Sequence, residues 1–465
     1  MSIIGIKGDH TTTEQRNTRM IRSGLTRFSH YTLPMLLALV LLMGCGPITG
    51  ANAQPGATAT HKATSVPSPT ATAVNLAASQ CPADLKSIAT CYTPQVFRAA
   101  YGVDKLIQQG ITGKGQTVID IVSFGSPTLQ QDMDVYDKQF DLPPVNLQII
   151  SPLNVKPYDP NGDRNGWAGE TTLDVEVIHA IAPDAKIVVL VSPVAETEGT
   201  IGLPEFRQLE QYTIDHKLGN IVSQSWAASE LTLEDAQGQQ ELQKWETLYQ
   251  KATTQQGMTY LSSSGDNGAT DYEDLQAKHI ASVPTTGFPT DSPWVTSVGG
   301  TTLTRSGSTF SEEAWQGSGG GFSRFYKTPS YQQTLPAADQ QQLKGQRGVP
   351  DIAGAADPRT GLVIYQGGGW IMVGGTSAAA PLWAGIVALA NQMAGHPLGF
   401  INPALYKLAA SSSYARDFRD ITVGNNTNLQ TNVQGYPAVQ GWDPVTGLGA
   451  PLANNLVPDL VAAMK

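Results

Sequence analysis

Gly-Gly-Thr-Ser-Ala-Ala-Ala-Pro, residues 374–381, is the stretch from which the fold and chemistry of this chain are best approached. Its glycines let the backbone come close to another group. The small residues after Ser377 suit a helix that begins at this serine and packs against a sheet. The N–H groups of its first turn would then face a developing negative charge. The pattern indicates a serine nucleophile, although a Gly-Thr-Ser string also occurs by chance.

A pair of acidic residues stands where a histidine motif would be expected, since the chain contains no His-Gly-Thr-His. Leu173 and Val177 belong to an apolar pattern of helical spacing, which predicts a helix with a buried face that ends at Pro183. Glu170 and Asp174 are one turn apart on this helix and share a face. If partly buried, they would share a proton and titrate together, which suits acid–base chemistry under acidic conditions. The alternative is two solvated acids in the first turns of a helix, where acids are favoured.

Short apolar or β-branched runs alternate with helical patterns such as residues 234–255. The predicted strands are Val118–Val122, Lys186–Val191, Ile221–Ser225 and Met258–Ser262. This alternation predicts βαβ units and an α/β fold, with a mostly parallel central β-sheet and helices on both faces. Ligands bind at the carboxyl ends of the strands in such sheets, and Ser225 and Asp266 follow two of these ends.

From about Cys81 to the C-terminus, an ordered set of motifs resembles the sedolisin family, the serine-carboxyl peptidases. The motifs are Glu-Thr-Thr-Leu-Asp at 170–174, Ser-Ser-Gly-Asp-Asn-Gly at 263–268, Ser-Val-Gly-Gly-Thr at 297–301, Ser-Gly-Gly-Gly-Phe-Ser at 318–323, Val-Pro-Asp-Ile at 349–352, the stretch at 374–381, Asp-Ile-Thr at 420–422 and Gly-Trp-Asp-Pro-Val-Thr-Gly-Leu-Gly at 441–449. The resemblance implies a subtilisin-like fold and a peptidase domain over residues 81–465.

The resemblance also implies the roles of four residues. Ser377 would be the nucleophile, Glu170 the general base that takes its proton, and Asp174 the residue that holds and tunes Glu170. This is the logic of a catalytic triad with a carboxylate in place of an imidazole. Asp266 matches the oxyanion residue of the family and must carry a proton to donate a hydrogen bond. The alternative for Asp266 is a turn residue in Gly-Asp-Asn-Gly.

A metal site is implied near the C-terminus. Asp420 and Asp443 would supply carboxylate oxygens, and the backbone carbonyls of Ile421, Val439 and Gly441 would complete the shell. Hard oxygen ligands suit Ca²⁺. Position 439 departs from the family pattern, in which a glycine stands there. The alternative is a pair of aspartate-capped turns without an ion.

Two further positions bear on the acid pair. Relatives carry a glutamate on the strand at 117–125 that extends the acid network; the equivalent here is Ser123, so the network is predicted to end at Asp174. Asp120, His179 and the serine occur in the chain order of a subtilisin-type set, but His179 lacks the flanking motif and is interpreted as a packing or surface residue. Trp226 would line the same region or be an ordinary core aromatic.

The composition excludes some functions. Charged residues make up 15% of the 465 residues, against about 25% in an average soluble domain. A net charge of −10 argues against nucleic-acid binding, which favours basic patches. Few charges also suit, weakly, a protein exposed to acid.

The pattern of residues 1–45 predicts a targeting segment. Arginines precede a short apolar run over 33–43, which ends in Leu-Met-Gly-Cys, a lipoprotein-like box with Cys45 as the residue to be lipidated. The alternative is an ordinary secretory signal. Residues 46–80, rich in Ala, Thr, Pro and Ser, are predicted to be a disordered tether. No room is left for the long pro-region of the family, so a short form is expected.

Cys81 and Cys91 remain after Cys45 is assigned to the signal. In an exported chain they are expected to form a small-loop disulfide, the alternative being two free thiols.

The leading hypothesis is a secreted or lipid-anchored, monomeric serine-type endopeptidase that hydrolyses proteins at acidic pH. One alternative is a catalytically silent surface lipoprotein that binds peptides or a cell-surface partner. Another is a Ca²⁺-stabilised lipoprotein with a structural role.

Overall fold

A mainly parallel sheet organises the part of the chain that the computed structural model describes, residues 81–85 and 91–465. These residues belong to one compact unit. The predicted targeting segment and tether lie outside them. The strands of the sheet are β1 (Thr117–Ser123), β2 (Asn146–Ile150), β3 (Lys186–Ser192), β4 (Ile221–Gln224), β6 (Thr259–Ser263), β8 (Thr296–Ser306), β9 (Thr309–Ala314) and β12 (Ile352–Ala355).

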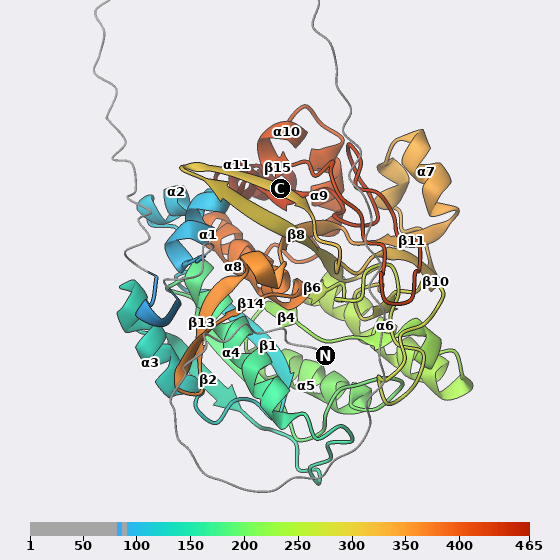
Figure 1. The fold of residues 1–465 in the computed structure, drawn as a ribbon, viewed down its shortest axis with the longest axis horizontal. Helices are drawn as coiled ribbons and strands as arrows, with labels where there is room; N and C mark the ends of the chain where they lie inside the picture. The colour runs from blue at the N-terminus through green and yellow to red at the C-terminus, as the bar shows by residue number, and fades with distance from the viewer. Residues whose placement is uncertain (1–80, 86–90) are drawn as a thin grey trace, which may run out of the picture. The chain divides into compact units, whose positions relative to one another are not determined.

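The strand order in the described residues is β12-β8-β6-β4-β1-β3-β2, and β9 pairs with β8 (Figure 1). Every pairing along that path is parallel, and only β9 runs antiparallel to its neighbour. The four predicted strands are confirmed to within one or two residues at their ends. Four two-stranded sheets flank this one: β5 (Ala228–Ser229) with β7 (Gly287–Phe288), β10 (Gly321–Lys327) with β11 (Gln346–Val349), β13 (Leu362–Gln366) with β14 (Gly369–Val373), and β15 (Phe418–Arg419) with β16 (Ala450–Pro451).

Helices account for most of the remaining regular structure. They are α1 (Pro94–Tyr101), α2 (Val103–Gln108), α3 (Leu129–Phe140), α4 (Arg164–Ile181), α5 (Leu203–His216), α6 (Ala236–Gln256), α7 (Ala337–Leu343), α8 (Thr376–Ala394), α9 (Asn402–Ala409), α10 (Tyr414–Asp417) and α11 (Ala453–Ala463), with short 3₁₀ turns at Ala83–Leu85, Glu230–Thr232, Gln332–Thr334 and Pro358–Thr360. The helix predicted over 170–181 is α4, and the pattern at 234–255 is α6.

The register of β1 and β4 shows that helices cover both faces of the sheet. Asp120 of β1 pairs with Ser223 of β4, so their side chains share a face. Gln224, the next residue, points to the opposite face, where it hydrogen-bonds with Glu210 of α5 and Tyr249 of α6. Asp120 faces α4, as its contact with that helix (below) shows. The α/β fold predicted from the sequence is confirmed.

Helices α4 and α8 pack side by side, and a glycine makes this close approach possible. A Cβ atom at Gly385 of α8 would lie 2.7 Å from the Cβ of Ile181 on α4. Residues 376–391 of α8 are all buried, so the helix is apolar on all sides. The two helices therefore hold their polar residues in fixed relative positions.

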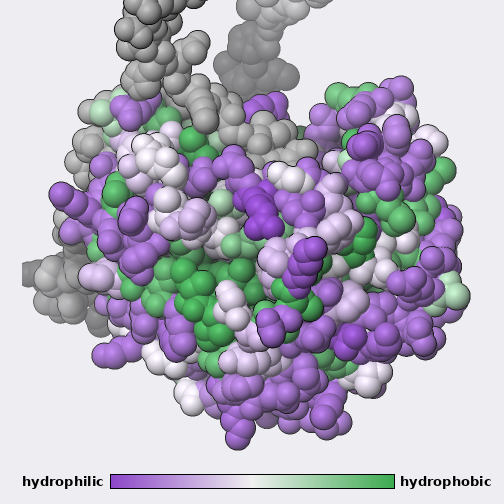
Figure 2. Space-filling view, turned by 90° about the horizontal axis from the view of Figure 1, so that it is seen from below, coloured by the Kyte–Doolittle hydropathy of each residue, from purple (hydrophilic) through white to green (hydrophobic). Residues whose placement is uncertain are grey.

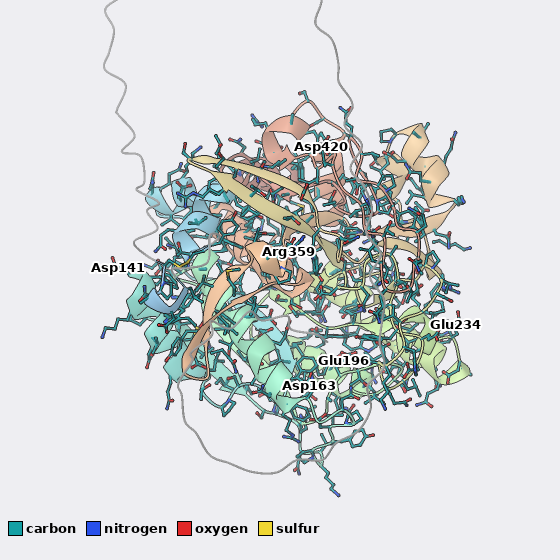
Figure 3. The ribbon with its side chains drawn as sticks, viewed as in Figure 1. Asp141, Asp163, Glu196, Glu234, Arg359 and Asp420 are labelled. Carbon is teal, nitrogen blue, oxygen red and sulfur yellow. A yellow bond between two sulfur atoms is a disulfide. The ribbon has the colours of Figure 1, made fainter. Side chains whose placement is uncertain are left out.

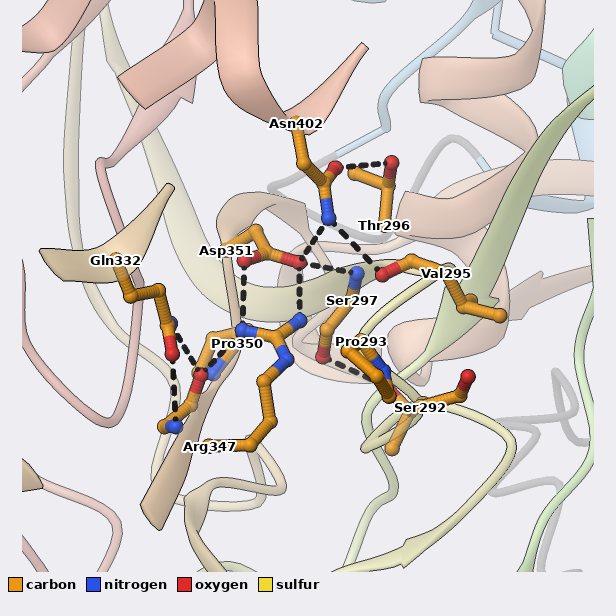
Figure 4. Close-up of polar contacts among 12 residues, drawn as sticks. Ser292, Pro293, Val295, Thr296, Ser297, Gln332, Arg347, Pro350, Asp351 and Asn402 are labelled. Atoms are coloured by element: carbon orange, nitrogen blue, oxygen red, sulfur yellow. Dashed lines mark hydrogen bonds and ion pairs between the residues drawn. The ribbon is translucent and has the colours of Figure 1, made fainter. Parts of the chain in front are cut away.

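A buried ion pair ties the far end of the sheet together (Figure 4). Arg347 Nη1 and Nη2 lie 2.8 and 2.5 Å from the two carboxylate oxygens of Asp351, and both side chains are fully buried. Asp351 also accepts hydrogen bonds from the Ser297 N–H at 2.8 Å and the Tyr406 hydroxyl at 2.7 Å. Asn402 bridges Asp351 to Thr296 of β8. Both carboxylate oxygens of Asp351 are satisfied, so removing Arg347 alone would leave a buried charge and destabilise the junction of β8, β12 and α9.

The predicted disulfide is confirmed: Cys81 and Cys91, ten residues apart, are joined. None of the described helices has the length and apolar character needed to cross a membrane. Figure 2 shows a mostly hydrophilic surface on the face seen from below, with a hydrophobic area left of its centre.

Candidate active site

Ser377 is the second residue of α8 and is only 5% exposed. The residue that caps the helix, Gly375, has φ +117°, a conformation that a residue with a side chain rarely adopts. The Ser377 hydroxyl lies beside the Glu170 carboxyl on α4, close enough to lower the pKa of that carboxyl. The structure therefore brings the predicted nucleophile and the predicted base together at the head of a buried helix.

Glu170 and Asp174 lie one turn apart on α4, and both are buried. Burial, and then the charge of Asp174, raise the pKa of Glu170 well above its usual range, while the Ser377 hydroxyl opposes this shift. The pKa of Asp174 is also raised, first by burial and then by the charge of Asp120. Two such carboxyls favour a state in which at least one is protonated. Two freely solvated acids, the alternative left open by the sequence, are excluded by this burial.

The prediction that the acid network ends at Asp174 is wrong. Asp120 of β1 is fully buried, and its carboxyl lies beside that of Asp174, whose pKa it raises. Neither oxygen of Asp120 receives a hydrogen bond from a donor among the described residues, which favours a proton shared between the two carboxyls. The sequence suggested Ser123 as the equivalent of the glutamate that extends the acid network in relatives. Its Oγ instead donates a hydrogen bond to the Val194 carbonyl oxygen at 3.0 Å.

Ser225, just beyond β4, was not assigned a role from the sequence. Its Oγ donates to Asp174 Oδ1 at 2.8 Å and lies 3.4 Å from the Ser377 carbonyl oxygen. The only signal for it was its place at the carboxyl end of a predicted strand. Asp120, Asp174, Glu170 and Ser377 thus form one chain of polar contacts, with Ser225 beside it.

Asp266 follows β6 and faces the same helix terminus. Its Oδ1 accepts the Thr376 N–H at 2.8 Å and the Thr376 hydroxyl at 2.9 Å. Oδ2 lies beside Gly375, where an added Cβ would come within 2.7 Å of it. Burial raises the pKa of Asp266, and the bonds from Thr376 partly offset that rise. Since Oδ1 is already an acceptor, Oδ2 is the oxygen left to carry a proton. Thr376, which the sequence did not single out, is what orients this carboxyl.

A pocket of about 430 Å³ opens onto these residues. Ser377, Asp266, Ser225, Trp167 and Trp226 line it. Trp226 is 2% exposed and also packs against the rings of core aromatic residues, so both readings of this tryptophan hold. The pocket supplies room for a ligand next to the Ser377 hydroxyl.

His179 belongs to a different cluster. Its Nε2 lies 2.9 Å from the Pro143 carbonyl oxygen and 3.1 Å from Asp137 Oδ1, and the side chain is fully buried. It therefore packs on the far part of α4, as the sequence interpretation held, rather than in the pocket.

The residues predicted to bind calcium partly converge. The Tyr414 hydroxyl donates to Asp420 Oδ1 at 2.9 Å and lies 3.3 Å from the Gly441 carbonyl oxygen. The charges of Asp420 and Asp443 both raise the pKa of this tyrosine, after burial, which places both carboxyls near it. Asp443 accepts the Val439 N–H at 3.1 Å from its Oδ2.

These oxygens suit a hard cation. Burial raises the pKa of Asp443 to about 7, against several backbone hydrogen bonds, and neither aspartate takes part in an ion pair among the described residues. Within the described ranges no three His, Cys, Asp or Glu side chains gather as a metal site, so carbonyl oxygens such as those of Ile421 and Gly441 would have to contribute. The two carboxylates and the Gly441 carbonyl fit such a role.

The model of the subtilase family matches residues 162–407, a segment that contains α4, β6 and the start of α8. The chain belongs to the subtilase family and, within it, to the sedolisins. The sedolisin branch is indicated by the relatives. Kumamolisin from Bacillus sp. (strain MN-32) is 34% identical over 80% of this chain and 64% of its own length. Tripeptidyl-peptidase 1 from Dictyostelium discoideum is 31% identical over 70% of this chain and 51% of its own length.

A solved structure agrees with this placement. Pseudomonas sedolisin, a serine-carboxyl proteinase in complex with two molecules of pseudo-iodotyrostatin, has a TM-score of 0.67 and 26% identity. The match covers 80% of this chain and 98% of that one. This sedolisin spans between about half and two thirds of the length of the curated relatives it matches, 64% and 51% for the two above.

Proposed function

We propose that this sedolisin is a serine-type endopeptidase that hydrolyses proteins at acidic pH, with Ser377, Glu170 and Asp174 as the catalytic triad and Asp266 as the oxyanion donor. The observation that carries the proposal is the proximity of the Ser377 hydroxyl, which lines the pocket, to the buried Glu170 carboxyl. A serine becomes a competent nucleophile when a base removes its proton as it attacks.

The proposed chemistry follows from this geometry. Ionised Glu170 accepts the Ser377 proton while Oγ bonds to the substrate carbonyl carbon, whose oxygen takes the negative charge. Protonated Asp266 donates a hydrogen bond to this oxygen from Oδ2, aided by the positive end of α8. Glu170 then gives its proton to the leaving amine, and water releases the acyl group from Ser377 by the same steps in reverse.

Asp174 and Asp120 are proposed as positioning residues. A proton shared between them leaves Asp174 without a full second charge beside Glu170. Ser225 keeps Asp174 in place through the bond to Oδ1. Glu170 can therefore ionise at a pH at which an isolated pair of buried acids would resist it.

The acidic pH optimum of the proposed activity follows from the protonation state of Asp266. This carboxyl must be protonated to donate, and its raised pKa allows that under acidic conditions only. At higher pH it loses the proton and the oxyanion loses its donor. At very low pH Glu170 is protonated and no longer accepts the Ser377 proton. We expect a bell-shaped profile of kcat/KM.

The remaining parts of the proposal are Ca²⁺ bound by Asp420 and Asp443 with the carbonyls of Ile421, Val439 and Gly441, a monomeric state, and a secreted or lipid-anchored location. The convergence of oxygens near Tyr414 supports the first. The location rests on the N-terminal sequence, which lies outside the described residues.

The deciding experiment is cleavage of an unfolded protein at acidic pH by the wild type and by Ser377→Ala. The variant should lose activity by several orders of magnitude and keep its melting temperature, because one hydroxyl is removed from a site that otherwise stays intact. Ser412→Ala, an exposed serine in a turn, is the matched control and should behave as wild type. Turnover by Ser377→Ala at the wild-type rate would contradict the proposal. Inactivity of both proteins would favour the alternative of a silent, peptide-binding relative. Analysis of the fragments separates internal cleavage from removal of tripeptides.

A further inference from the structure

Five carboxyl side chains line the pocket beside Ser377, those of Asp159, Asp163, Glu196, Asp266 and Asp271. The proposed catalysis uses only that of Asp266, and the other four form an acidic wall. Among the described residues that line the pocket, Lys278 is the single base, and its side chain is exposed. Figure 3 labels two residues of this wall, Asp163 and Glu196. The pocket lining therefore holds more acidic than basic side chains.

Glu196 is the carboxyl of this wall without a partner. It is 5% exposed, and its Oε1 has no hydrogen-bond partner. Its backbone is fixed, because the Glu196 N–H donates to the Oγ of Ser123, the last residue of β1, at 2.9 Å. A Cβ on Gly202, at the start of α5, would lie 2.6 Å from the Glu196 Cα, so this helix presses against the segment. A buried carboxyl held in place without a donor is costly unless a ligand satisfies it.

Two more acids stand next to Glu196. Glu198 accepts the Ser229 N–H at 2.7 Å and the Thr232 hydroxyl at 3.0 Å. Asp271 accepts the Asn267 side-chain amide at 3.0 Å, and its charge acts on both glutamates. Glu198 is therefore anchored by the protein, whereas Glu196 is free to bind. None of these three acids belongs to an ion pair among the described residues.

We propose that Glu196, supported by the charges of Glu198 and Asp271, binds a positively charged group of the peptide substrate. This inference rests on the proposed function. The cation is an ammonium or guanidinium group, which donates the hydrogen bond that Glu196 lacks. Burial raises the pKa of Glu196, and the charge of a bound cation favours its ionised form. Trp167 and Trp226 line the same pocket and would contact the apolar stem of such a group.

Two sources supply this chemistry: a lysine or arginine side chain of the substrate, or its free N-terminal ammonium. The experiment uses one peptide in which lysine is moved through successive positions around the cleaved bond. Each peptide is made with lysine or its uncharged ε-acetyl form, and with a free or acetylated N-terminus. kcat/KM at acidic pH is measured for the wild type, Glu196→Gln, Asp271→Asn and the control Glu234→Gln, a surface acid.

For one of the pairs of peptides that differ only in charge, the wild-type kcat/KM should be about tenfold or more higher for the charged peptide. This ratio corresponds to the free energy of a hydrogen bond to a charged group. Glu196→Gln should lose most of this preference, while cleavage of the uncharged peptide is kept. Asp271→Asn, on a different loop, should weaken the same preference, and Glu234→Gln should keep it. Dependence on lysine identifies a side chain as the source, and dependence on the free N-terminus identifies the terminal ammonium. An equal preference in wild type and Glu196→Gln would overturn the inference, as would its absence from all pairs.

A binding measurement separates this inference from the proposed function. Calorimetry with Ser377→Ala uses Nα-acetyl-arginine amide, its uncharged citrulline counterpart, and alanine amide, which carries only the free α-ammonium. Tighter binding of one charged probe, lost when Glu196→Gln is added, supports the cation site even if no peptide is cleaved. If peptides are cleaved but no probe or peptide shows the charge preference, the peptidase proposal stands and the cation site is rejected.

Discussion

At the scale of single residues, the site depends on how protons are distributed among buried acids. Asp120 shows this most clearly, because it extends the acid pair to three carboxyls. Its charge raises the pKa of Asp174, after burial, and Asp174 in turn raises that of Glu170. A substitution at Asp120 should therefore change the reactivity of Ser377 through Asp174 and Glu170, without contact between Asp120 and Ser377.

Asp120→Asn should shift the acidic limb of the kcat/KM profile towards higher pH and lower its maximum by up to about tenfold, equivalent to 1.4 kcal/mol. The amide can still donate a hydrogen bond to Asp174 but no longer repels its charge, so Asp174 ionises more readily, and its full charge then raises the pKa of Glu170 further. Asp120→Leu, which removes the bond as well, should cost more. The pH profile of each variant is the measurement. A lowered rate with an unmoved profile would mean that Asp120 serves only in packing.

The sequence could locate individual residues but not their contacts across elements. Ser377, Glu170, Asp174 and Asp266 were found because a family motif or a helical spacing points to each. Asp120 was set aside, because nothing in its own strand reveals that it meets Asp174; that contact depends on how α4 crosses β1. Thr376 was overlooked for a similar reason, since its role is to orient Asp266, which lies 110 residues earlier in the chain.

At the scale of elements, the packing of α4 on α8 sets the distance between base and nucleophile. The strands β1, β3, β4 and β6 and the helices α4, α6 and α8 were predicted, because buried parallel strands are apolar runs and helices show a 3.6-residue repeat or begin at a recognisable motif. The closeness of the two helices was not predicted, because it rests on Gly385, a single glycine in an apolar run.

Gly385→Ala should destabilise the fold by about 1–3 kcal/mol and reduce kcat more than it raises KM. The added Cβ would fall 2.7 Å from the Ile181 Cβ, so α8 must move away from α4 and carry Ser377 from Glu170. The melting temperature and the two kinetic constants test this. Wild-type stability together with wild-type kcat would show that the helices adjust without disturbing the site.

The segment around Tyr414 should respond to chelation. If Ca²⁺ binds only the folded state through Asp420 and Asp443, its removal lowers the melting temperature by mass action. EDTA should therefore lower it in the wild type, and Asp443→Ala should abolish the response. An unchanged wild-type melting curve at low free Ca²⁺ would reject the site, and Val439 in place of glycine would be the first residue to replace.

At the scale of the whole molecule, several acids are buried with raised pKa values. Burial is the first cause for each of Asp120, Glu170, Asp174, Glu176, Glu210 and Asp291. They lie on both faces of the sheet, so the effect is not confined to the catalytic site. A fold built in this way favours conditions under which its acids are protonated.

The melting temperature should therefore be higher near pH 4 than near pH 7. In the unfolded chain these acids ionise at about pH 4, whereas in the folded protein they resist ionisation. Below about pH 4 they are protonated in both states and cost nothing. As pH rises above that value only the unfolded chain loses protons, and each group lowers stability by about 1.4 kcal/mol per pH unit until its folded form ionises too. Glu210→Gln offers a matched test, because Glu210 lies on α5, on the opposite face of the sheet from α4, and its amide counterpart does not titrate. This variant should show a shallower fall of the melting temperature between pH 4 and 7 with an unchanged pH profile of activity. A melting temperature that rises over that range in the wild type would show that ion pairs such as Arg347–Asp351, rather than buried protonated acids, set the stability of the fold.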